Sequence, residues 1–114
     1  MLYHKLLGFP KSIKLPVGPI NLVPSTHAND RAAENGCKVP DKLIIDAYRI
    51  FEIETHDDVN IVKFMYRTRY NAKDDIVVSL LAKGNNTFLV KTCWLNRRDD
   101  KHATLALHKY DKIN

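Results

Sequence analysis

The second half of the chain alternates apolar and polar side chains with a period of two, and turn residues interrupt this alternation. The longest alternating run covers residues 59–70, an almost wholly apolar run covers 76–82, and a further run covers 87–95. Residues 71–74 and the Gly-Asn-Asn sequence at 84–86 supply turns, since Gly and Asn tolerate the backbone of tight hairpins. A period of two places alternate side chains on opposite faces of a strand. The pattern predicts an antiparallel meander in which the almost wholly apolar 76–82 strand is central.

The segments before this meander are less regular. Residues 50–55 predict a fourth, short strand, and the turn at 56–58 joins it to the long one. Residues 1–24 contain four prolines, at positions 10, 16, 19 and 24. Proline interrupts helices and donates no hydrogen bond to a neighbouring strand. We therefore expect residues 1–24 to form an extended arm with one short edge strand.

Two helices are expected between the arm and the strands. Ser25 or Thr26 can cap a helix over residues 27–35, and Asn35-Gly36 can end it. Ala28 and Ala32 share one face of this helix, and their small side chains would let it pack closely on a sheet. Pro40 precedes a second amphipathic helix over residues 41–49. Its apolar positions recur at helical spacing: Leu43, Ile44, Ala47, Tyr48 and Phe51.

These elements predict an α+β fold, with two N-terminal helices packed on one face of a three- to four-stranded antiparallel sheet. The 114 residues suffice for one domain, 1–114, with the Pro-rich arm at 1–24 and a basic C-terminal tail at 97–114. Residues 104–107 could add a short strand within that tail. The expected core joins the sheet positions Val62, Phe64, Tyr66, Val78, Leu80, Phe88 and Val90 to Leu43, Ile44, Ala47 and Tyr48 of the second helix.

Apolar content and cysteine usage indicate a cytoplasmic protein. No apolar run approaches the roughly 20 residues of a membrane helix, and residues 1–10 lack the features of a signal peptide. Cys37 and Cys93 show neither a CxxC spacing nor a zinc-ligand spacing with the five histidines. We therefore expect free thiols rather than a disulfide, and neither a metal ion nor another cofactor.

Positive charge is concentrated in the second half of the chain. Residues 1–58 carry 7 Lys or Arg and 8 Asp or Glu, a balance of −1, whereas residues 59–114 carry 11 and 5, a balance of +6. A one-sided basic surface attracts polyanions, of which nucleic acid is the usual one. The alternative is that the total of +5 only keeps a small protein soluble.

Two pairs of side chains could carry chemistry on a phosphodiester. His27 and Arg31 lie one helical turn apart, where a histidine can transfer protons and an arginine can hold a phosphate. The alternative is a solvated helix face on which Glu34 pairs with Arg31. Arg67 and Arg69 alternate on the long strand and could clamp a phosphate; the alternative is an ordinary exposed strand face.

The last strand and the loop after it form a third candidate region. Strict alternation would place Thr92, Trp94 and Asn96 on the same face as Phe88 and Val90. Trp94 could stack on a base or simply belong to the core. The further candidate nucleic-acid contacts are Lys91, Arg97, Arg98, Lys101 and His102. The loop could equally be self-paired through Asp99 and Asp100.

Missing motifs narrow the chemistry. The chain has no Gly-rich phosphate loop and no GxSxG sequence, and its paired acidic residues fall in expected turns. Adjacent turn residues rarely converge on one metal ion, so a two-metal nuclease is not expected. Metal-free cleavage of a nucleic acid requires RNA, whose 2′-hydroxyl can attack its own phosphodiester.

Two stretches of the sequence resemble motifs of a known protein superfamily. The helix start Ser-Thr-His-Ala-Asn-Asp-Arg-Ala over residues 25–32, with Gly36 after it, and the strand Val-Lys-Thr-Cys-Trp over 90–94 resemble the RelE/barnase-like superfamily of small ribonucleases and toxin domains. The similarity spans residues 25–96. It implies two helices followed by a four-stranded antiparallel sheet, and RNA cleavage without a metal. His27 then matches the helix histidine, Arg31 the residue one turn on, Arg67 a strand arginine and Thr92 a last-strand hydroxyl.

Two functions follow as hypotheses. The first is a metal-independent endoribonuclease, toxin-like, with catalytic His27, Arg31, Arg67 and Thr92, and with an acidic antitoxin as partner. The second is a small basic protein that binds RNA or another polyanion, or inhibits a host protein, without catalysis.

Overall fold

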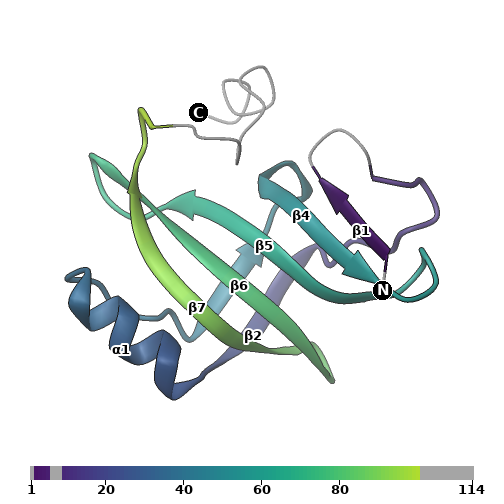
Figure 1. Cartoon of the computed structure of the whole chain (residues 1–114), viewed down its shortest axis with the longest axis horizontal. Helices are drawn as coiled ribbons and strands as arrows, with labels where there is room; N and C mark the ends of the chain where they lie inside the picture. The colour runs from purple at the N-terminus through teal and green to yellow at the C-terminus, as the bar shows by residue number, and fades with distance from the viewer. Residues whose placement is uncertain (1, 6–8, 101–114) are drawn as a thin grey trace.

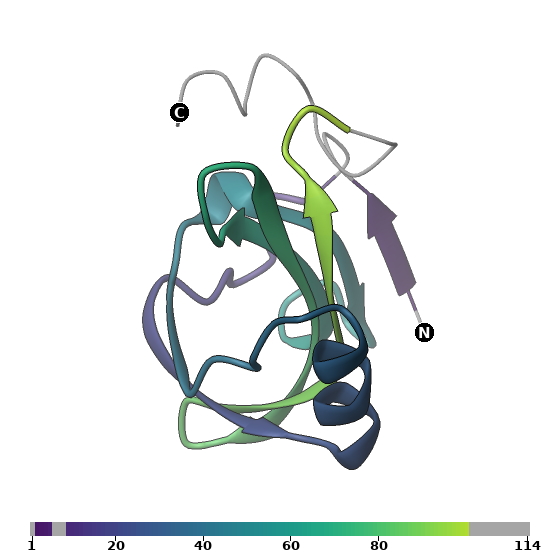
Figure 2. The same cartoon turned by 90° about the vertical axis from the view of Figure 1, so that its left-hand side faces the viewer.

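A computed structural model describes residues 2–5 and 9–100, which form one seven-stranded mixed sheet in the order β1-β4-β5-β6-β7-β2-β3. The strands are β1 (Leu2–Lys5), β2 (Gly18–Pro24), β3 (Lys42–Ile45), β4 (Ile50–Thr55), β5 (Ile61–Arg69), β6 (Asp74–Gly84) and β7 (Thr87–Arg97). Helix α1 (Thr26–Glu34) follows β2, and the short 3₁₀ helix η1 (Ala47–Arg49) joins β3 to β4. The sheet curls strongly, and α1 lies beside β7 (Figures 1 and 2).

The α+β expectation with two helices on one face of a small sheet is wrong. Within the described residues the protein is mostly β, with a single α-helix, and the curled sheet supplies most of its own core. The second helix expected over residues 41–49 is instead strand β3 followed by η1. Short apolar runs suit either structure, and here Leu43, Ile44 and Ile45 pair with β2. The β-branched isoleucines favour that extended backbone.

The Pro-rich arm contains one strand more than expected, and that strand is not at an edge of the sheet. It contains the edge strand β1, and it also contains β2, which lies inside the sheet between β7 and β3. The prolines of β2 sit near its ends: Pro19 lies outside the pairing with β7, which begins at Asn21, and Pro24 is the last strand residue. Internal pairing is therefore carried by the central residues, whose amide groups are intact.

The predicted meander is confirmed. Strands β4, β5, β6 and β7 pair in sequence order and antiparallel, and β6 lies between β5 and β7. The expected hairpin turn joins β6 to β7, where Asn85 and Asn86 both take positive φ angles of 52° and 59°. Helix α1 also forms where expected, with Ser25 as its N-cap and Gly36 at φ 72° after its end.

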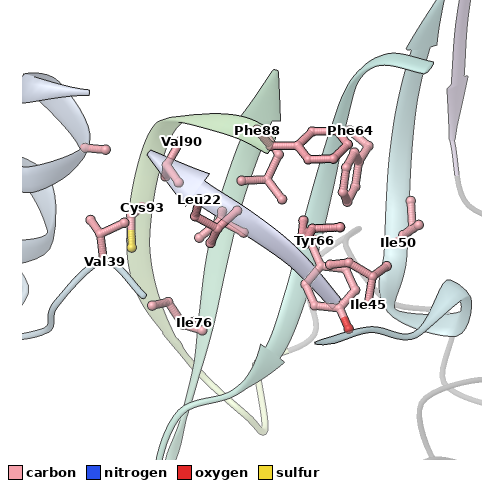
Figure 3. Packing of buried hydrophobic residues seen from close by; sticks show 14 of the residues in the cluster. Leu22, Val39, Ile45, Ile50, Phe64, Tyr66, Ile76, Phe88, Val90 and Cys93 are labelled. Atoms are coloured by element: carbon pink, nitrogen blue, oxygen red, sulfur yellow. The ribbon is translucent and has the colours of Figure 1, made fainter. Parts of the chain in front are cut away.

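The core fills the inside of the curl (Figure 3). Six of the seven sheet positions expected to be buried are buried, namely Phe64, Tyr66, Val78, Leu80, Phe88 and Val90, whereas Val62 is half-buried. Phe64 makes edge-to-face contacts with the rings of Tyr66 and Phe88. The predicted partners from the second helix are wrong in part, because Ile44 is 79% exposed and Tyr48 is 58% exposed.

Tyr66 links two distant parts of the curled sheet. Its hydroxyl accepts a hydrogen bond from the Asp46 amide at 2.9 Å and donates to the Ile44 carbonyl at 3.3 Å. Tyr66 belongs to β5, whereas Ile44 is in the edge strand β3. Burial raises the pKa of the Tyr66 hydroxyl, so it stays protonated and able to donate at neutral pH.

Helix α1 covers the part of β7 that β2 leaves unpaired. Strand β2 pairs with β7 only over Thr87–Val90, and the Ser25 amide makes the last contact, with the Val90 carbonyl at 3.0 Å. Beyond that point α1 packs on β7 through Ala28 and Ala32, which are both buried as expected. No helix in the described part of the chain is long and apolar enough to cross a membrane.

Candidate functional site

A groove lies between α1 and β7, with a volume of about 420 Å³. Its lining residues are Arg31 and Asn35 from the helix and Thr92 and Trp94 from the strand. Two of the four catalytic candidates, Arg31 and Thr92, therefore meet although they lie far apart in the sequence. Asn35 was expected only as a helix end. Its spacing of one turn from Arg31 is the signal that could have identified it.

A β-bulge in β7 determines which side chains reach this groove. Ser79 pairs with Thr92 and Leu80 pairs with Val90, so Lys91 is an extra residue in β7. The bulge reverses the alternation beyond it. Cys93 consequently joins Val90 in the core, and Thr92 and Trp94 face outward. The strict alternation expected from the sequence is wrong here, because Thr92 and Trp94 do not share a face with Val90.

Both ends of α1 are fixed against β7. At the N-terminal end the Ser25 hydroxyl donates to the Lys91 carbonyl at 3.2 Å. After the C-terminal end, the Cys37 amide donates to the Ala32 carbonyl at 2.9 Å, and Cys37 packs against the core that contains Cys93. The helix thus lies beside β7, and Arg31 and Asn35 lie on the side of the helix that lines the groove.

His27 lies in the first turn of α1, on the exposed side. It does not line the groove itself, but side chains four residues apart on a helix are neighbours, with Cβ atoms about 5–6 Å apart. His27 is therefore next to Arg31 on the side toward Lys91, which is exposed at the bulge. The helix N-terminus at this position also favours an anion.

Arg31 is accessible to a ligand. Its side chain is 53% exposed, and its ion pair with Glu34 is long, at 4.0 Å. The ion pair between Glu34 and Arg31 that was expected as the alternative does form, but it is a loose contact on the surface. Pairs of this kind are worth only about 0–1 kcal/mol, so a phosphate can compete for the guanidinium.

Arg67 is not part of the groove. It is fully buried and donates from Nε to Oδ2 of Asp75 at 2.9 Å, and its Nη2 donates to the carbonyls of Arg97 and Asp100. Arg98 binds the other oxygen of Asp75 at 3.0 Å. The expected phosphate clamp of Arg67 and Arg69 therefore does not form, because Arg67 holds the end of the sheet together.

The remaining candidate contacts are dispersed. Arg69 is exposed at the end of β5, and Arg97 is exposed and paired with Asp99 at 3.2 Å, as the self-paired alternative expected. Arg98 lies against the 71–74 turn, where it donates to the Asn71, Ala72 and Asp74 carbonyls. Lys101 and His102, and the short strand expected at 104–107, lie outside the described residues.

The two cysteines are free thiols that meet under α1. Burial, together with the neighbouring Cys37, raises the pKa of Cys93 to about 12, and burial also raises the pKa of Cys37. Both thiols therefore stay protonated at neutral pH and contribute packing rather than nucleophilic chemistry.

Within residues 2–5 and 9–100, no group of three or more His, Cys, Asp or Glu is arranged to hold a metal ion. Comparisons with protein families, curated proteins and solved structures gave no match to the chain.

Proposed function

We propose that the groove between α1 and β7 binds RNA and cleaves it without a metal ion. The observation that carries the proposal is that Arg31 and Thr92 line the same groove, with His27 one turn away on the same helix. A guanidinium, a hydroxyl and an imidazole are the groups that such a cleavage needs.

The reaction divides between these groups as follows. His27 removes the proton from the ribose 2′-hydroxyl, whose oxygen then forms a bond to phosphorus. The bond from phosphorus to the 5′-oxygen breaks, and that oxygen takes a proton from water or from the protonated imidazole. Arg31 and the Thr92 hydroxyl donate hydrogen bonds to the non-bridging oxygens, where negative charge develops. The products are a 2′,3′-cyclic phosphate and a 5′-hydroxyl.

The test is cleavage of a mixed-sequence RNA oligonucleotide by the purified chain in the presence of EDTA. We expect products ending in a 2′,3′-cyclic phosphate, and no cleavage of the DNA oligonucleotide of the same sequence. His27→Ala and Arg31→Ala should each lower the rate by about 10²-fold or more. Thr92→Val, which removes the hydroxyl and keeps the shape, should lower it as well.

Matched controls separate the site from general charge effects. His56→Ala removes an exposed histidine from the turn before β5, and Lys83→Ala removes an exposed cation near the end of β6. Both variants should cleave at the wild-type rate. Equal losses in His56→Ala and His27→Ala would refute the assignment. Binding of RNA by the wild-type chain without any product would favour the non-enzymatic alternative.

A further inference from the structure

We propose that Trp94 stacks on an unpaired nucleobase next to the phosphate held by Arg31 and Thr92, so that the groove accepts single-stranded RNA and rejects duplex. The inference rests on the proposed function, because it assigns the substrate class of the same groove. It goes beyond that function because base stacking on Trp94 does not depend on cleavage.

The first supporting observation is the unusual position of this side chain. A large aromatic residue in a small domain normally belongs to the core. Here the bulge at Lys91 turns Trp94 to the outer face of the sheet, where it is only half-buried and lines the groove. Its cross-strand partner Val77 is 1% exposed, and Cys93 beside it is fully buried. The ring therefore lies on a firmly packed part of the sheet, as a stacking platform requires.

The second observation is that the groove combines polar lining side chains with one aromatic side chain. Thr92 and Trp94 are two residues apart on one face of β7, a separation of about 7 Å along the strand. Arg31 and Asn35 are four residues apart on α1, a separation of about 6 Å along the helix. The two rows lie next to each other, because all four side chains line the same groove and α1 lies beside β7 (Figure 1).

This combination matches the parts of a nucleotide. Arg31 and Thr92 offer hydrogen-bond donors to a phosphate, and Trp94 offers a flat apolar surface to a base. The volume of about 420 Å³ lies in the range of sites that hold small ligands. Every base has a flat face, so a stacking site of this kind tolerates any sequence. A base within a duplex would first have to leave its stack, and duplex RNA is therefore disfavoured.

Trp94 is the only tryptophan in the chain, so its fluorescence reports on the groove alone. The probe is a single-stranded oligonucleotide with 2′-O-methyl riboses, which lacks the attacking hydroxyl and cannot be cleaved by this route. We expect saturable quenching by this probe and little quenching by its duplex with the complementary strand. Absence of quenching, or equal quenching by duplex and single strand, would overturn the inference.

A pair of variants tests the same point by affinity. Trp94→Leu should weaken binding of the single-stranded probe by about 5- to 150-fold, whereas Trp94→Phe should keep most of the affinity, because a phenyl ring also stacks. Tyr48→Leu, which removes an exposed aromatic residue on η1, should bind as the wild type does. Unchanged binding by Trp94→Leu would contradict the inference.

The outcomes for stacking and for catalysis are separable. Quenching by the single-stranded probe without cleavage of ordinary RNA would support the Trp94 site and refute the proposed nuclease. Cleavage of single-stranded and duplex RNA at equal rates, with Trp94→Leu fully active, would support the nuclease and refute the Trp94 site.

Discussion

The buried carboxylate of Asp75 offers the sharpest test of the fold. It accepts hydrogen bonds from Arg67 on one oxygen and from Arg98 on the other, at 2.9 and 3.0 Å. Arg67 and Asp75 are fully buried, and the Arg98 side chain is 18% exposed. The substitution Asp75→Asn keeps the size of the side chain and removes its charge, so it tests electrostatics without opening a cavity.

The expected loss follows from what the substitution leaves behind. Two guanidinium groups would share a buried site without their carboxylate, and breaking a buried ion pair in this way costs about 3–5 kcal/mol. Domains of this size unfold at a cost of about 5–15 kcal/mol, so Asp75→Asn removes a large share of the stability. In an Arg67→Met background the same substitution should cost less, because one of the two guanidinium groups is then absent. The two costs should differ by about 0.5–3 kcal/mol.

The assay is urea unfolding followed by circular dichroism, with Asp99→Asn as the matched control. Asp99 forms an ion pair with Arg97 at 3.2 Å, but both side chains are more than 70% exposed. Its replacement should leave the unfolding curve nearly unchanged, because exposed pairs contribute little. Equal stability of Asp75→Asn and Asp99→Asn would refute the contribution of the buried ion pairs. If Asp75→Asn cost the same free energy of unfolding in the wild-type and Arg67→Met backgrounds, the interaction between Asp75 and Arg67 would be refuted.

Two further predictions concern the contact between α1 and β7. Ala32→Leu should destabilise the fold by about 1–3 kcal/mol in urea unfolding, because Ala32 is buried where α1 packs on β7, and it should also lower any RNA cleavage in the groove. Ala33 is exposed, so Ala33→Leu should change neither stability nor cleavage. The pKa of Cys93 rises from 9.0 to about 12 on folding, so its contribution to stability is complete below pH 9 and is lost as the pH rises toward 12. Between pH 9 and 12, the free energy of unfolding should fall more steeply for the wild type than for Cys93→Ala. Equal slopes for the two proteins would contradict the raised pKa of Cys93.

Local sequence signals were sufficient for the elements that contact their neighbours along the chain. The meander from β4 to β7 was predictable because hairpins join adjacent strands, and the alternation and the Asn-Asn turn both specify them. Helix α1 was predictable because Ser25 and Gly36 mark its two ends.

Elements stabilised by distant partners were not predictable in the same way. Strand β2 lies inside the sheet because it pairs with β7, which is far from it in the sequence. Strand β3 in turn pairs with β2. The spacing of Leu43, Ile44 and Ala47 fits a helix as well as a strand, and only the available edge of β2 decides between them. For Arg67, alternation placed the side chain on the outer face correctly, but the burial of that face near Asp75 depends on the segment after β7.

The bulge at Lys91 joins the fold to the candidate site. Without the extra residue, the alternation beyond Val90 would turn Thr92 and Trp94 into the core and Cys93 outward. With it, the small Cys93 side chain lies under α1, which lets Ala28 and Ala32 approach the strand, and the hydroxyl and the indole face the groove. One additional residue in β7 thus brings to the groove the two side chains to which we assign the binding of a phosphate and a base. Lys91 itself is exposed, so the residue that creates the bulge also places a positive charge beside the N-terminal end of α1, where Ser25 binds its carbonyl group.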